Sequence, residues 1–194
     1  MSVSAVLKVS GLSKYFVNGF LWGAQKVVAV DGLDFNLERG EIFGLLGPNG
    51  AGKTTTLNML AGIMKPSSGS IDIFGSPFFP GKIATLAKIG YVPEATSLPG
   101  YFTISELLDF YGQLFDMPAS VRFERIKRLL EMVGLVRERN YLIKNLSMGQ
   151  RRLVDIMQAL INDPDLIFLD EPTVYLDPVI IERLRSILLG LKNE

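Results

Sequence analysis

The sequence predicts an α/β fold, in which an N-terminal antiparallel β subdomain precedes a parallel sheet with helices on its faces and an α-helical subdomain is inserted. Short β-rich pieces and turns alternate in the first fifth of the chain. Helical and strand patterns then alternate up to about residue 94 and return after residue 146, whereas strand patterns vanish between them. Strands separated by helical stretches are typical of parallel sheets. We therefore expect one domain, 1–194, with an α/β core at 1–94 and 146–194 and a helical subdomain at 95–145.

Strands are expected where β-branched and other apolar residues cluster between turns. In chain order they are residues 6–9, 27–30, 33–37, 42–46, 70–74, 88–92 and 166–169. Helical runs are expected at 55–61 and 153–161, between the strands at 70–74 and 88–92, and after the strand at 166–169.

Two amphipathic helices are expected in the insertion. The first opens with Thr103-Ile-Ser-Glu106, a capping box in which the Thr hydroxyl and the Glu carboxylate satisfy amides of the first helical turn. The second runs from about Ala119 to Val133 and stops at Gly134, a residue common just after helix ends.

Composition limits the chemistry. The chain has 194 residues, 48% of them hydrophobic, which is enough to form one buried core without stabilising disulfides or metals. It has no Cys and no His, which excludes disulfides, thiolate or imidazole metal sites, and the Ser-His and Cys-His nucleophiles. Catalysis must come from Asp, Glu, Lys, Ser, Thr and backbone amides.

Net charge and hydropathy limit the classes of partner that the chain can have. A net charge of +0 gives no overall field to attract nucleic acid, so we expect no nucleic-acid partner. The first residues lack a secretory signal pattern, and no window approaches the roughly 18 consecutive apolar residues of a membrane helix. We therefore expect a chain that does not span a membrane by itself. The mean hydropathy of +0.28 fits either a well-filled core or a surface for a partner.

The strongest motif is a phosphate-binding loop, which places the core in the P-loop NTPase class. Residues 47–54 fit G-x-x-x-x-G-K-[ST] between an expected strand and an expected helix. Its glycines let backbone amides turn toward phosphate oxygens, Lys53 neutralises the β- and γ-phosphates, and Thr54 ligates Mg²⁺. The residues expected to hold the nucleotide are Gly47, Pro48, Asn49, Gly50, Ala51, Gly52, Lys53, Thr54 and Thr55.

A pair of carboxylates follows the last expected strand. Asp170 and Glu171 end the apolar run 166–169, at the edge of an α/β sheet where ligands bind. Asp170 can join the Mg²⁺ shell, and Glu171 can polarise a water for attack on the γ-phosphate. A solvated turn is the alternative, and the phosphate loop favours the catalytic interpretation.

A third motif, Leu146-Ser-Met-Gly-Gln150, precedes a helical stretch, where Ser147 by itself indicates a helix N-cap. In this order the three motifs resemble the ATP-binding cassette (ABC) family, over about residues 7–191. The resemblance implies that residues 146–150 correspond to the LSGGQ signature, with Met148 in place of the first glycine. In that family the signature closes over ATP held by the other subunit, so Ser147, Gly149 and Gln150 would meet nucleotide in trans.

The resemblance assigns further positions. Phe16 falls at the aromatic that stacks on adenine, with Tyr15 as the neighbouring candidate, an ordinary strand aromatic as the alternative, and Val28 as a further nucleotide-binding residue. Asp177 matches the D-loop, which links the two sites of the dimer. Glu94 takes the Q-loop position, where most members have Gln, and its oxygens still suit Mg²⁺ or water. Such replacements are familiar in the exporter subgroup.

One departure concerns the C-terminus. The family continues with a strand that ends in a switch histidine, whereas this sequence stops at Glu194. We expect either a fragment of a longer chain or a reduced protein that binds nucleotide without efficient turnover.

Two segments bear on partners. The loop 96–102 follows the Q-loop, where the family docks a helix of its membrane subunit, although its aromatics can instead cap the subdomain's own core. The segment 18–26, with the only Trp, has no assigned role.

The resemblance thus implies an ATP-binding subunit of an exporter-like ABC transporter, an ATPase with the cofactors ATP and Mg²⁺. Its partners would be an integral membrane permease and a second cassette, in a homodimer or heterodimer, at the cytoplasmic face of the cell membrane. The alternatives are a soluble ABC ATPase without a transport role and a noncatalytic ATP-binding regulatory remnant.

Overall fold

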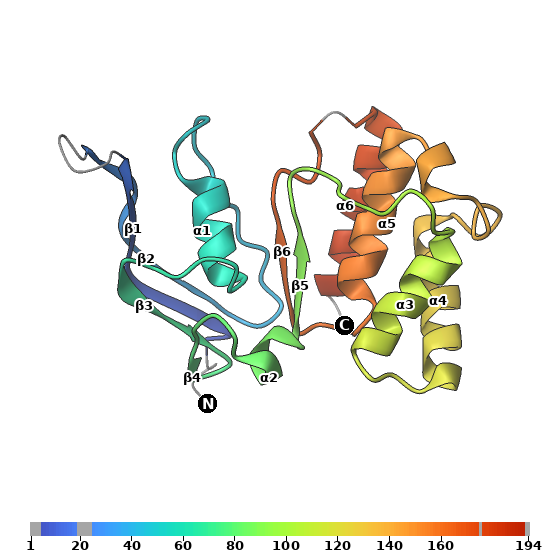
Figure 1. The fold of residues 1–194 in the computed structure, drawn as a ribbon, viewed down its shortest axis with the longest axis horizontal. Helices are drawn as coiled ribbons and strands as arrows, with labels where there is room; N and C mark the ends of the chain where they lie inside the picture. Colours follow the sequence, from blue (N-terminus) through green and yellow to red (C-terminus); the bar gives the residue numbers. More distant parts are fainter. Residues whose placement is uncertain (1–4, 19–24, 175, 193–194) are drawn as a thin grey trace. The chain divides into compact units, whose positions relative to one another are not determined.

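The computed structural model describes residues 5–18, 25–174 and 176–192. The chain divides into two compact units, residues 1–86 and 87–194 (Figure 1). The segment 18–26, for which the sequence suggests no role, lies largely outside the described residues. None of the described helices is long and apolar enough to cross a bilayer.

The first unit is built on an antiparallel sheet, as the sequence predicts for the N-terminal strands. The strand expected at 70–74 also joins this sheet, antiparallel to its first strand, and not the parallel pair. Its strands are β1 (Leu7–Asn18), β2 (Gln25–Leu37), β3 (Ser68–Ile73) and β4 (Ser76–Pro77), in the order β2-β1-β3-β4. Helix α1 (Lys53–Leu60) and the short α2 (Ile83–Leu86) complete it. Leu7 and Val9 of β1 are buried while Lys8 between them is exposed, the alternation of a strand with one face in a core.

The prediction of a strand at 42–46 is wrong. Residues 41–48 have no regular secondary structure, and no ladder partner is found for them among the described residues. Ile42 is 56% and Leu46 92% exposed, although Phe43 stacks on Phe35 of β2 with 4.8 Å between ring centroids. An apolar run shows that a segment is suited to burial, but a strand also needs a neighbour for its amides and carbonyls.

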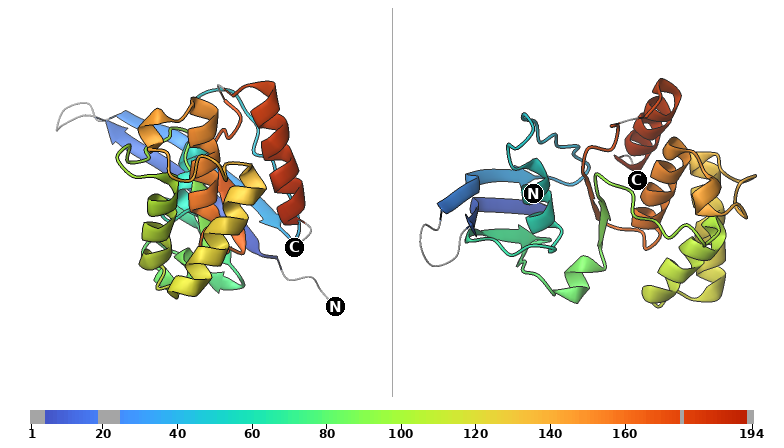
Figure 2. Two further views of the ribbon diagram at one scale, coloured as in Figure 1. Left: turned by 90° about the vertical axis from the view of Figure 1, so that its right-hand side faces the viewer. Right: turned by 45° about the horizontal axis from the view of Figure 1, so that its top comes forward.

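The second unit holds the parallel pair that the sequence predicts. Strands β5 (Ile89–Val92) and β6 (Leu166–Leu169) align from Ile89 opposite Leu166 to Val92 opposite Leu169. The helices are α3 (Ile104–Leu114), α4 (Ala119–Val133), the 3₁₀ turn η1 (Ile143–Asn145), α5 (Met148–Leu160) and α6 (Pro178–Lys192). Figure 2 shows α3 and α4 beside α5.

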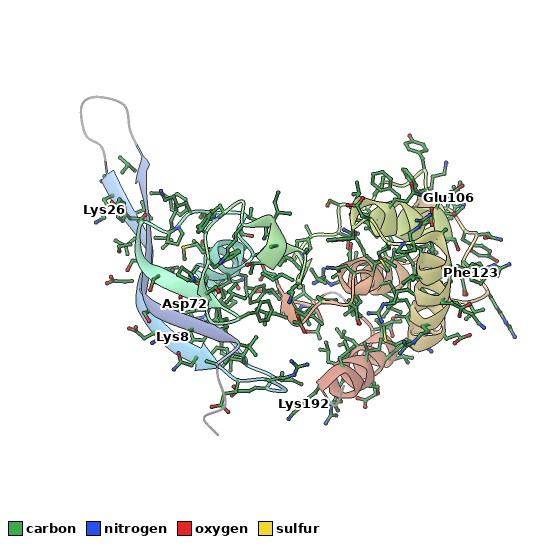
Figure 3. All side chains as sticks on the ribbon, turned by 90° about the horizontal axis from the view of Figure 1, so that it is seen from below. Lys8, Lys26, Asp72, Glu106, Phe123 and Lys192 are labelled. Atoms are coloured by element: carbon green, nitrogen blue, oxygen red, sulfur yellow. The ribbon has the colours of Figure 1, made fainter. Side chains whose placement is uncertain are left out.

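Both helices of the insertion have the expected ends. The Thr103 hydroxyl accepts a hydrogen bond from the Glu106 amide at 3.2 Å, and the Glu106 carboxylate accepts one from the Thr103 amide at 2.8 Å. These bonds lower the pKa of the Glu106 carboxyl. Helix α4 ends at Gly134, whose φ of 69° is left-handed. Figure 3 shows Glu106 and Phe123 on this helical part.

Helix α5 lies in the centre of the second unit. Leu153 and Met157 of α5 share one buried apolar cluster with Leu107 of α3, Leu130 of α4 and Val92 of β5. Because α5 touches each of these elements, its first turn is held in a fixed position relative to the carboxyl end of β5.

Candidate nucleotide-binding site

The phosphate loop takes backbone conformations that favour glycine. Gly50 and Gly52 have φ angles of 82° and 86°, and a Cβ on Gly52 would lie 2.2 Å from the Ala29 carbonyl oxygen of β2. Gly52 is the N-cap of α1 and has no side chain to satisfy the first amides of the helix. Such amides bind anions, since the helix dipole adds positive charge at that end.

The side chain of Lys53 lies over the same loop. Its ammonium donates to the carbonyls of Gly47 and Pro48, at 2.9 and 3.2 Å. A pocket of about 270 Å³ beside Lys53 is also lined by Val30 of β2 and Thr56 of α1. The loop, the ammonium and the exposed Thr54 hydroxyl therefore gather in the first unit as a set of groups suited to a polyphosphate.

The aromatic pair Tyr15 and Phe16 is divided between the two faces of the β1–β2 ribbon. Tyr15 pairs with Val28 and Phe16 with Val27, so Phe16 and Val28 lie on opposite faces. The Lys14 ammonium lies 5.3 Å from the centre of the Phe16 ring, which places these two side chains on one face.

That face is the one that α1 occupies. Val30, the cross-strand partner of Lys14, has a methyl carbon 3.1 Å from the Cβ that Gly52 would carry. The Lys14 ammonium donates to the carbonyl of Lys65, beyond α1, at 2.8 Å. Phe16 is therefore on the side of the phosphate loop, and Tyr15 and Val28 are on the other.

The carboxylates of the second unit gather at one edge of the parallel pair. Glu94 follows β5 by two residues, Asp170 and Glu171 follow β6 directly, and the Asp170 amide donates to the Val92 carbonyl at 2.9 Å. Parallel register makes both strands end at this edge. Glu171 has a φ of 43°, a strained conformation of the kind found at functional sites.

Asp170 is suited to be a metal ligand. Its side chain is 1% exposed, and its Oδ2 atom has no hydrogen-bond partner among the described residues. A buried carboxylate oxygen without a partner is costly unless a cation or water meets it, and Mg²⁺ prefers oxygen ligands. Among the described residues no cluster of three or more acidic side chains that could hold a metal is found.

Arg152 of α5 is a residue whose role the sequence did not reveal. It is 4% exposed, and its guanidinium donates to the carbonyls of Pro93, Glu94, Asp170 and Pro172. Burial lowers the pKa of this guanidinium, while Asp155, Asp170 and Glu94 raise it. A signal was available, because Arg152 shares a helix face with Ile156 and Ala159 and a charge on an apolar face calls for partners.

Asp155 is the second buried charge of α5. It is 5% exposed, lies 3.9 Å from the Arg152 guanidinium, and accepts a hydrogen bond from the Thr96 hydroxyl at 2.5 Å. Burial raises the pKa of its carboxyl, which the Thr96 hydroxyl and Arg152 partly oppose. Burial and the nearby Asp170 raise the pKa of Tyr91 in β5.

The signature begins α5 with the N-cap that the sequence indicates. The Ser147 hydroxyl accepts from the Gln150 amide at 3.2 Å, and the Gln150 side chain accepts from the Ser147 amide at 2.9 Å. A Cβ on Gly149 would lie 2.9 Å from Ile180 of α6 and 3.7 Å from the Asp177 carboxylate. Asp177 caps α6 by accepting from the Ile180 amide at 3.0 Å. The signature and the D-loop position therefore lie side by side.

The aromatics of the loop 96–102 divide between two environments. Phe102 packs against the core cluster and lies 5.9 Å from the ring of Phe110, whereas Tyr101 is 84% exposed. Phe102 thus caps the subdomain's own core, and Tyr101 is available on the surface.

Two features are typical of the P-loop nucleotide-binding class: a glycine-rich phosphate loop at a helix N-terminus, and an apolar strand followed by a buried carboxylate, Asp170, and a half-buried one, Glu171. The sequence profile described as ABC transporter matches residues 30–174, and the chain belongs to that family.

Proteins with similar sequences support this family assignment. An uncharacterized ABC transporter ATP-binding protein of Nostoc sp. is 44% identical over 190 residues, which are 97% of this chain and 56% of the relative. The Nod factor export ATP-binding protein I of Ralstonia nicotianae is 42% identical over 192 residues, 97% of this chain and 57% of the relative. The chain thus spans little more than half of the length of these proteins.

The solved structures show the same fold. One is a dimeric ATP-binding cassette in a post-hydrolysis state bound to ADP and Pi, with a TM-score of 0.83 and 28% identity. The match covers 96% of this chain and 82% of that one.

Proposed function

We propose that this chain is the ATP-binding part of an ABC exporter, which binds and hydrolyses Mg-ATP in a head-to-tail dimer and drives transport through a separate membrane subunit. The observation that carries the proposal is the phosphate loop, where Gly52 leaves no room for a side chain and Lys53 lies over the loop. The export relative from Ralstonia nicotianae supports the direction of transport. The protein would then act at the cytoplasmic face of the cell membrane.

The site residues divide the chemistry among them. The loop amides, Lys53 and Thr54 bind the phosphates, and Phe16 stacks on the adenine. Bound Mg²⁺, held by Thr54, Asp170 and Glu94, would supply charge neutralisation at the phosphates. Glu171 orients the attacking water and accepts its proton.

The signature contributes in trans. Ser147, Gly149 and Gln150 of one subunit meet the nucleotide held by the other, and Asp177 beside Gly149 links the two sites. ATP therefore closes the pair and hydrolysis lets it open.

The domain organisation is part of the same proposal. The core at 1–94 and 146–194 and the helical subdomain at 95–145 act as one ATP-binding domain. Tyr101 supports a docking surface for the membrane subunit in the loop 96–102, because its exposed aromatic ring suits an interface.

The test is Mg-ATP turnover by the purified chain over a series of protein concentrations. Turnover per chain is expected to rise with concentration and then to level off, because each site needs a second copy. Saturable ATP binding with no turnover at any concentration would contradict the ATPase and leave a nucleotide-binding protein.

The proposed stacking of Phe16 on the adenine of ATP gives a testable prediction. We expect Phe16→Ala to weaken ATP binding about fivefold or more, since stacking on a base contributes roughly 1–3 kcal/mol. Tyr15→Ala, on the opposite face, should cause a smaller loss. Binding is measured by calorimetry with ATP and with inorganic triphosphate, and the affinity for triphosphate should stay the same in both variants. Equal losses of ATP affinity in the two variants would contradict the assignment, because they would show that lying on the same face as α1 does not decide which aromatic stacks on the adenine.

The signature gives a prediction with an internal control. Ser147→Ala and Thr103→Ala each remove the hydroxyl of a capping box, so each should lower the free energy of unfolding by about 1 kcal/mol. Only Ser147→Ala should also lower ATP turnover in the folded protein, because Thr103 caps α3 in the helical subdomain. Denaturant unfolding and turnover are measured for both. Equal turnover in the two variants would leave Ser147 with a capping role alone.

A further inference from the structure

The guanidinium of Arg152 joins the two loops that carry the carboxylates. Its donors reach the carbonyls of Pro93 and Glu94 after β5, and those of Asp170 and Pro172 after β6. The bond to Asp170 is 2.8 Å long and buried. One side chain from α5 thus connects the carboxyl ends of both strands.

The contacts go to backbone carbonyls and not to the carboxylates of Glu94 and Asp170. Arg152 bonds the Glu94 and Asp170 carbonyl oxygens, while the Asp170 Oδ2 atom has no partner among the described residues. The planar guanidinium carries five donors in a fixed arrangement, so it can hold several carbonyls at set separations. A lysine ammonium has three donors on a flexible stem, so it can bond some of these carbonyls but cannot hold all four in a fixed plane.

Asp155 and Thr96 secure the same loop at its far end. The Thr96 hydroxyl donates to Asp155, which lies one helical turn after Arg152 on α5. The segment from Pro93 to Thr96 is therefore held by α5 at both ends. Its position follows α5, and α5 begins with the signature.

We propose that Arg152 is a positioning residue for ATP hydrolysis, which holds Glu94, Asp170 and Glu171 as one set of oxygen groups around the Mg-nucleotide. Asp155 orients the guanidinium. This inference rests on the proposed function. It also gives α5 a role in hydrolysis beyond its signature, because a shift of α5 moves both carboxylate loops together.

The test compares Arg152→Met and Arg152→Lys with Arg125→Met. Arg125 is a matched control in the same unit, since its mostly buried guanidinium also bonds a carbonyl, that of Leu160, at 2.7 Å and pairs with Asp163. Arg125 belongs to α4, and the Leu160 carbonyl that it bonds is at the opposite end of α5 from the signature. Thermal unfolding, ATP affinity in EDTA, ATP affinity in Mg²⁺ and turnover are measured for each protein.

Both Arg152 variants should bind ATP in EDTA within about twofold of the wild type, because the phosphate loop is unchanged. They should lose most of the gain in affinity that Mg²⁺ gives, and turnover should fall 10–100-fold, the usual cost of losing a group that orients metal ligands. Arg152→Lys should lie between Arg152→Met and the wild type. Arg125→Met should lower the unfolding temperature and keep both the Mg²⁺ gain and the turnover.

The outcomes separate the two proposals. A wild-type chain with neither a Mg²⁺ gain nor turnover would overturn the proposed function. An active wild type with folded Arg152 variants that keep the Mg²⁺ gain, or with Arg125→Met losing it equally, would overturn the positioning role alone. Should Arg152→Met not fold, Arg152→Lys decides, because it keeps the buried positive charge and loses only the planar set of donors.

Discussion

Glu171→Gln is expected to lower ATP turnover at least 100-fold while ATP binding is kept. The glutamine has almost the same shape but cannot accept the proton of the attacking water, and general base catalysis contributes about 10²–10⁴-fold. The proposed function adds a second effect, since ATP that is not hydrolysed should hold the dimer closed. Turnover is measured at saturating Mg-ATP, and the dimer by size-exclusion chromatography with ATP.

Glu94→Gln is the matched control, because Glu94 lies at the same edge of the parallel pair and is exposed. Its amide oxygen still offers a ligand, and most ABC members have glutamine at this position. We expect a loss of tenfold or less. A larger loss in Glu94→Gln than in Glu171→Gln would assign the proton acceptor to the Q-loop position instead.

Gly52→Ala is expected to weaken ATP binding at least 100-fold. The new Cβ would lie 2.2 Å from the Ala29 carbonyl, and the φ of 86° is unfavourable for alanine. Backbone cannot yield as a flexible side chain does, so the loop has to move by about an ångström, and shifts of that size cost about 10²-fold at positioned sites. Calorimetry with ATP measures the loss.

Gly50→Ala separates the clash from the backbone strain. Gly50 has a similar φ of 82°, but a Cβ there meets nothing within 4 Å. We expect a smaller loss of ATP affinity in this variant, set by the strain of roughly 1–2 kcal/mol. Equal losses would mean that the left-handed conformation, and not the contact with β2, makes Gly52 necessary.

Helix ends were predicted from the sequence because their causes are local. The capping box of Thr103 and Glu106 and the end of α4 at Gly134 depend on groups within one helical turn, and both are confirmed. The phosphate loop and the carboxylates after β6 were found for a similar reason, since each motif is one short segment.

Contacts between distant segments were not predictable. The bond from Arg152 to Pro93 spans 59 residues, and the arginines after the signature do not reveal in the sequence which carbonyls they meet. The aromatic pair shows the same limit, because both Tyr15 and Phe16 lie in β1 and only the register with β2 places Phe16 on the side of α1.

The sequence by itself therefore determined the class of fold, the start of α3, the end of α4 and the nucleotide-binding motifs, because periodicity, capping and short motifs act within a few residues. The tertiary structure decided which aromatic faces the phosphate loop, that residues 42–46 form no strand in the described structure, and that α5 holds both carboxylate loops through Arg152. These features depend on partners that are far away in the chain, and side-chain packing and hydrogen bonds select those partners only when the chain is folded.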